Sequence, residues 1–152
     1  MAMNNPYVAG IDCVYTAYTG EKRYTKSSWE DVTGLSVDLN YSGKKLIICS
    51  ICIGTNGGAN VGFRFCDDNG ELQPMRAKTN NREPVHFSVE PPTNSRENQC
   101  VWTFHVVADC HGKVRLQIRL DDTALAIVNG IYDQRDRHYN HATISTLTVL
   151  SL

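Results

Sequence analysis

The sequence predicts an all-β domain, a jelly-roll β-sandwich, and three observations support this fold class. The 152 residues include 34 Val, Ile and Thr against 19 Ala and Leu, and β-branched side chains favour strands because they lose χ1 freedom in a helix. Several segments alternate apolar and polar residues with a period of two. Turn-forming residues separate these segments at the spacing of an all-β domain. Eight or more short strands are therefore expected, and the jelly roll is the commonest closed arrangement for them near this length.

Alternation predicts strands along most of the chain. The clearest is residues 113–120, where aliphatic residues alternate with Lys, Arg and Gln, so one face is dry and the other charged. The same pattern predicts strands at 35–39, 61–66 and 101–108. No segment keeps a helical period over three turns, so very little helix is expected.

The segment 46–53 differs because it is apolar on both faces. One face of an antiparallel sheet normally meets water, so a strand that is apolar on both sides predicts a covering partner subunit. The expected oligomer interface therefore consists of residues from this strand: Ile47, Cys49, Ile51 and Ile53. In the C-terminal run 141–152, apolar residues also fall on both faces, but they are mixed with Thr and Ser.

Two polar stretches, 71–82 and 90–99, are predicted to be long surface loops. Sugars are bound by aromatic faces together with planar amide, carboxylate and guanidinium groups, and the loop 71–83 and the segment 129–141 supply these groups. The candidate ligand-binding residues are Arg76, Asn80, Arg82, Tyr132, Asp133, Arg135 and Tyr139. The alternative interpretation is that these side chains only keep the loops in solution.

Charge and hydropathy exclude several classes of protein. A formal net charge of -1 gives no basic surface for nucleic acid. No window approaches 18 consecutive apolar residues, so we expect no membrane insertion. Residues 1–10 lack the basic start and apolar run of a signal peptide. The expected location is a virion or the cytoplasm of the producing cell.

The six cysteines are predicted to be free, mostly buried thiols rather than disulfides, because they lie largely within apolar runs and no secretory signal is visible. Cys49 and Cys52 form a C-x-x-C pair. Residues three apart on a strand point to opposite faces, so this pair is not expected to hold zinc.

No enzyme, cofactor or metal site is predicted. The sequence has no G-x-S-x-G, and its cysteines do not resemble activated nucleophiles. Asp136, His138 and His141 would bind a metal only if a tight turn brought them together, and a polar strand edge explains them more simply. A cupin-like metal enzyme, which needs two or three converging histidines, is the least favoured alternative.

Residues 28–152 contain a series of short motifs in a fixed order. Trp29–Val37 reads "W-x-D-V-x-G-L-S-V", and an apolar strand, then "V-G-F-R", "V-x-L-Q-x-R" and "L-T-V-L-x-L" strands follow. This series resembles the C1q/TNF-like jelly-roll domains found in phage tail and capsid appendage proteins and their bacterial relatives. The resemblance implies a compact homotrimer that binds through exposed loops and has no catalytic activity. The cysteine content and the tyrosine-rich first 25 residues depart from this pattern.

Two functional hypotheses follow. The first is a non-enzymatic structural or adhesive module, a phage-like homotrimer that presents loops to a cell-surface glycan or another virion protein. The alternative is a free-standing carbohydrate-binding lectin. The expected organisation is an N-terminal segment, 1–26, which could add a strand, followed by one jelly-roll domain, 27–152.

Overall fold

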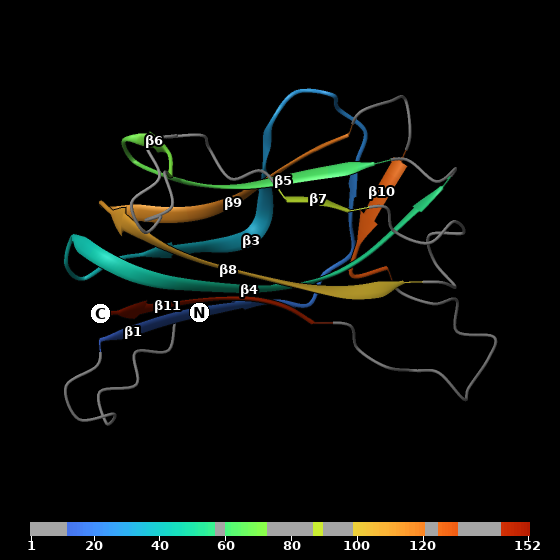
Figure 1. Ribbon diagram of the computed structural model, residues 1–152. Coiled ribbons are helices and arrows are strands. Elements are labelled where there is room, and N and C mark those ends of the chain that lie inside the picture. The colour runs from blue at the N-terminus through green and yellow to red at the C-terminus, as the bar shows by residue number, and fades with distance from the viewer. Residues whose placement is uncertain (1–11, 57–59, 73–86, 90–98, 121–124, 131–143) are drawn as a thin grey trace.

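The computed structural model describes residues 12–56, 60–72, 87–89, 99–120, 125–130 and 144–152. Over these ranges the chain forms strands and no helix, and two antiparallel sheets pack face to face as a sandwich (Figure 1). No helix in the described ranges is long and apolar enough to cross a membrane.

The first sheet is organised around its longest strand, β4. One edge of β4 pairs with β8, while its other edge pairs first with β11 and then with β10. The outer strands are β1, which pairs with β11, and β2, which pairs with β10. The bounds are β1 (Cys13–Tyr18), β2 (Lys22–Tyr24), β4 (Gly43–Asn56), β8 (Cys100–Cys110), β10 (Leu125–Val128) and β11 (Ser145–Ser151).

The second sheet has β9 and β5 at its centre. β3 pairs with the outer edge of β9, and the far edge of β5 pairs with β7 and, beyond a turn, with β6. The bounds are β3 (Glu30–Asp38), β5 (Val61–Asp67), β6 (Gly70–Glu71), β7 (Phe87–Val89) and β9 (Lys113–Leu120).

The strand order confirms the jelly-roll prediction. Four strands run in the order β1-β11-β4-β8 in one sheet and four in the order β3-β9-β5-β7 in the other, so each sheet contains strands from both halves of the chain. Alternation predicts the strands at 35–39, 61–66, 101–108 and 113–120, and the apolar run predicts the strand at 46–53. All five ranges fall largely within observed strands. β7 and β10 are too short for alternation to reveal them.

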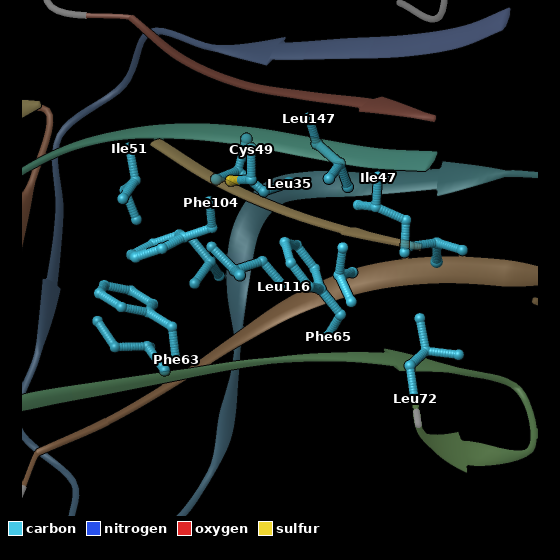
Figure 2. Close-up of a cluster of buried hydrophobic side chains, with 14 of the residues drawn as sticks. Leu35, Ile47, Cys49, Ile51, Phe63, Phe65, Leu72, Phe104, Leu116 and Leu147 are labelled. Carbon is cyan, nitrogen blue, oxygen red and sulfur yellow. The ribbon is translucent and has the colours of Figure 1, made fainter. Parts of the chain in front are cut away.

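The core lies between the two sheets. Figure 2 shows Ile51, Cys49 and Leu147 of the first sheet pointing toward Phe63, Phe65 and Leu116 of the second. The ring of Phe104 on β8 lies 5.2 Å from that of Phe63 and 4.7 Å from that of Phe87, so aromatic contacts join the sheets.

The predicted oligomer interface on β4 is wrong, because the residues assigned to it lie in the core of the single chain. The four residues assigned to it are completely buried within the single chain and pack in the core: Ile47, Cys49, Ile51 and Ile53, each 0% exposed. The opposite face of β4 holds Leu46, Ile48 and Ser50, which are half-buried. A partner could therefore contact β4 only through this second face.

A cluster of buried polar groups, which we call the buried joint, lies where the pairing partner along one edge of β4 changes from β11 to β10. The amide of Cys52 donates to Ser145 Oγ at 3.0 Å, and its carbonyl accepts from the amide of Asn129 at 2.9 Å. Asn129 has a positive φ of 50°, which asparagine tolerates better than most residues. The Gln99 side chain bonds both the amide and the carbonyl of Gly130, at 3.0 and 2.9 Å. The two bonds to Cys52 continue the hydrogen bonding along this edge of β4 across the gap between β11 and β10.

Candidate functional site

The outer face of the second sheet carries the densest polar chemistry among the described residues. Because β9 alternates strictly, its aliphatic residues fill the core and Arg115, Gln117 and Arg119 point outward. The register places Arg119 opposite Gly62, Gln117 opposite Arg64 and Arg115 opposite Cys66 on β5. We call this surface, together with Trp29, Asp31 and Glu71, the arginine face.

A chain of hydrogen bonds crosses the arginine face from strand to strand. Gln117 Nε2 donates to Asp31 Oδ1 at 2.8 Å, and Gln117 Oε1 accepts from Arg64 Nε at 2.8 Å. Arg64 Nη1 then forms an ion pair with Glu71 Oε2 at 3.0 Å. Four side chains from β3, β9, β5 and β6 are thereby held in fixed orientations, which reduces the entropy that a ligand would otherwise have to remove.

Trp29 lies directly before β3 and covers part of the same surface. The guanidinium carbon of Arg64 lies 4.5 Å from the Trp29 ring centroid, and that of Arg119 lies 4.9 Å from it, both within cation–π range. The ring reaches across the sheet because Gly62 has no side chain there. A Cβ at that position would lie 3.3 Å from Trp29 Cη2 and 3.2 Å from Arg119 Cγ.

The third arginine of this face, Arg115, has a different partner. Its Nη2 donates to the carbonyl oxygen of Asp67 at 3.0 Å, and within the described ranges no carboxylate forms an ion pair with it. Burial raises the pKa of the neighbouring Cys66 thiol, an effect that the positive charge of Arg64 partly offsets. Cys66 is therefore a hydrogen-bond donor here, to Gln117 Oε1 at 3.2 Å, rather than a thiolate nucleophile.

The outer face of the first sheet has the opposite character. Its residues on β1, β11, β4 and β8 include no Asp, Glu, Lys or Arg between the ends of the paired strands: Cys13, Tyr15, Ala17, Thr146, Thr148, Leu150, Leu46, Ile48, Ser50, Cys52, Val101, Thr103, His105 and Val107. Val101 is 63% exposed and Tyr15 37%. We call this surface the uncharged face. Lys44 and Asp109 lie opposite each other just beyond it.

All six cysteines are free thiols, which agrees with the prediction. Cys49 points into the core, whereas Cys52 lies on the other face of β4. The C-x-x-C pair therefore diverges, as expected for residues three apart on a strand. Among the described residues, no group of His, Cys, Asp and Glu side chains could hold a metal ion.

The ligand-binding residues predicted from sequence lie outside the described residues: Arg76, Asn80, Arg82, Tyr132, Asp133, Arg135 and Tyr139. The same is true of Asp136, His138 and His141. The arginine face was not predicted as a site. Its sequence signal is the alternating Arg-x-Gln-x-Arg of β9, but this pattern is equally typical of a strand with one solvated face.

Comparisons with known proteins add little. No family model matches the sequence, and no protein with a curated description matches it. Among solved structures, the carbohydrate-binding module of lichenase 5A from Cellvibrio mixtus, in complex with cellotriose, aligns with 100% of this chain and 86% of that chain. The identity is 13% and the TM-score 0.40. A similarity this low transfers neither a ligand nor a site.

Proposed function

We propose that this chain is a non-enzymatic structural or adhesive module that assembles as a homotrimer through its uncharged face. The observation that carries the proposal is the absence of Asp, Glu, Lys and Arg from that face across four adjacent strands. The solvated face of an antiparallel sheet is normally polar. A surface without these charges can be covered by another copy without leaving a charged group desolvated.

The size of the uncharged face supports the same proposal. Four strands about 4.8 Å apart, each contributing roughly seven residues at about 3.4 Å, give a flat area on the order of 400 Å². Contiguous patches of this size on a monomer often mark interaction sites. The hydroxyls of Ser50 and Thr103 bond to each other at 2.9 Å, so one of their two donor protons is already paired when the face is covered.

The number of subunits and the biological setting follow from the resemblance of residues 28–152 to jelly-roll domains of phage appendages. In this setting the trimer belongs to a virion, or waits in the cytoplasm of the producing cell, and presents its loops to a cell-surface glycan or another virion protein. The uncharged face lies inside the trimer, and the arginine face stays outside.

Light scattering coupled to size exclusion tests the assembly at micromolar concentration. The expected mass is three times that of the chain. Ile48→Lys places a charge at the centre of the uncharged face and should yield monomers, whereas Ser88→Lys, on the exposed side of β7, should leave the trimer intact. A monomeric mass for the unaltered protein would contradict the proposal.

A second candidate function is a carbohydrate-binding module, and the arginine face favours it. An indole ring lies beside guanidinium, amide and carboxylate groups whose orientations are fixed by hydrogen bonds, and sugars are bound by aromatic faces together with such planar groups. A glycan array separates the two functions: selective binding to a defined sugar supports the second candidate, while the absence of any binding leaves the structural role.

A further inference from the structure

His105 is an exposed side chain in the middle of β8, on the uncharged face. It lies directly opposite Ile48 on β4, which is opposite Thr148 on β11, and Thr148 in turn is opposite Tyr15 on β1. Directly paired residues on adjacent strands point to the same face of a sheet, so these four side chains form one row across it. His105 therefore belongs to the surface that a second copy covers in the proposed trimer.

The side chains that surround His105 on this face are neutral. Its diagonal neighbours on β4 are Leu46 and Ser50, and the adjacent residues of the same face on β8 are Thr103 and Val107. In the part of the chain that the structure describes, no carboxylate forms an ion pair with the imidazole. A positive charge on this ring therefore has no local counter-charge.

The first charged side chains that the paired strands place on this side of the sheet lie at its end. Asp109 is four residues beyond His105 on β8, about 13 Å along the strand. Lys44 is directly opposite Asp109 on β4, so the two charges offset each other. The region of the uncharged face that another copy would cover supplies no acid either, because its described residues include no Asp or Glu.

His105 also differs from the other titratable residues described on the uncharged face, which are two thiols and one phenol: Cys13, Cys52 and Tyr15. Thiols and phenols ordinarily ionise above pH 8, and burial raises the pKa of Cys13 and of Cys52 further. Histidine is the side chain that ordinarily changes its charge between pH 5 and 8. Acidification in this range therefore adds charge to the described part of the face only at His105.

We propose that protonation of His105 separates the subunits, so that the assembly is stable at neutral pH and dissociates in mildly acidic solution. This inference rests on the proposed homotrimer and names the group that regulates it. A neutral imidazole can be covered at modest cost, whereas an imidazolium would lose its water without gaining a carboxylate. Dissociation takes up one proton per subunit, so a fall in pH favours the separate chains.

Light scattering coupled to size exclusion, at micromolar concentration, tests the proposal between about pH 8 and about pH 5.5. We expect the mass of three chains at the higher pH and of one chain at the lower. Below about pH 6.5 the association constant should fall by up to about a thousandfold per pH unit, tenfold for each subunit. Far-UV circular dichroism should be the same at both pH values, because the subunits separate without unfolding.

Substitutions identify the responsible group. His105→Gln keeps a neutral polar side chain at every pH, so this variant should remain trimeric at about pH 5.5. His105→Lys carries a charge throughout the range and should be monomeric even at about pH 8. The matched control is His111→Gln, in the turn directly after β8, where the histidine is exposed and lies outside the uncharged face. The control should dissociate at the same pH as the unaltered protein.

The possible failures are distinguishable. A mass of one chain at about pH 8 would reject the homotrimer and this inference with it, as would a His105→Lys variant that stays trimeric through a different surface. A trimer that persists at about pH 5.5 would reject the regulation but keep the homotrimer. Acid dissociation that His105→Gln shares, or that His111→Gln abolishes, would assign the effect to another group.

Discussion

The hydroxyl of Ser145 donates a 2.7 Å hydrogen bond to Asn129 Oδ1 in the interior of the protein, and so ties the start of β11 to the end of β10. The same hydroxyl accepts from the Cys52 amide, and Asn129 Nδ2 donates to the Tyr18 carbonyl at 2.6 Å. Ser145→Ala would leave the Cys52 amide and Asn129 Oδ1 without this hydrogen-bond partner. We expect the free energy of unfolding to fall by about 1–3 kcal/mol, measured by urea denaturation.

The control for this prediction is Ser88→Ala. Ser88 is exposed on β7, so the same substitution there should change the free energy of unfolding by less than about 0.5 kcal/mol. Equal effects at the two serines would show that the buried joint contributes nothing beyond the loss of a hydroxyl.

Gly34 in β3 lies where the register against β9 shifts, between Asp31 and Ser36. Its φ is +77°, and an added Cβ would come within 2.5 Å of Tyr18 Cδ2. Gly34→Ala therefore combines an unfavourable backbone conformation with a clash. We expect a loss of about 1–3 kcal/mol in the free energy of unfolding.

A double-variant cycle separates the two causes. Tyr18→Ala removes the ring, so Gly34→Ala should cost less in that background than in the unaltered protein, and the remaining cost reports the backbone conformation. Strict additivity of the two substitutions would contradict the clash.

Phe104 joins the two sheets through its ring contacts with Phe63 and Phe87. Phe104→Ala should lower the free energy of unfolding by about 3–5 kcal/mol, because it removes buried area and leaves a cavity. Asp109→Ala is the control on the same strand, since Asp109 is exposed and lies beyond the uncharged face, so its truncation should cost less than about 0.5 kcal/mol. Thermal unfolding followed by near-UV circular dichroism gives both values.

The fold was predictable from the sequence because alternation is a local property. In residues 113–120 each outward residue differs sharply in polarity from its neighbours, and the structure has a strand with these bounds. In β4 the same rule could not decide which face is inside, because both faces are largely aliphatic. Lys45 even lies on the inner side, 3% exposed, where its Nζ bonds Ser151 Oγ at 2.6 Å.

The arginine face was beyond sequence reasoning for a different reason. Trp29, Arg64 and Arg119 are separated by dozens of residues, and only the pairing of β3 with β9 and of β9 with β5 brings them together. Strand order depends on long-range packing that a single sequence does not display. Loops carry ligand sites more often than sheet faces do, so the predicted ligand-binding residues are loop residues, and these lie outside the described ranges.

Burial raises the pKa of the Cys49 thiol to about 12, from an ordinary value near 9. Between these values the unfolded chain releases this proton while the native protein retains it. The contribution of the neutral thiol to stability is therefore complete below pH 9 and is lost as the pH rises toward 12. The free energy of unfolding should fall in this window by up to about 1.4 kcal/mol per pH unit from this group.

Urea denaturation between pH 8 and about 10.5 covers this window, since the range begins below the ordinary thiol pKa and ends below the raised one. Burial raises the pKa of Cys110 to about 12 as well, so the effect of Cys49 is the difference between the unaltered protein and Cys49→Ala, both of which retain Cys110. Cys49→Ala should be less stable at pH 8, because truncation of a completely buried side chain leaves a cavity. Its free energy of unfolding should nevertheless decline less steeply with pH. Cys13→Ala, at a half-buried thiol, should keep most of the steep decline. Parallel curves for Cys49→Ala and the unaltered protein would mean that this thiol ionises with the same pKa in both states, which its complete burial argues against.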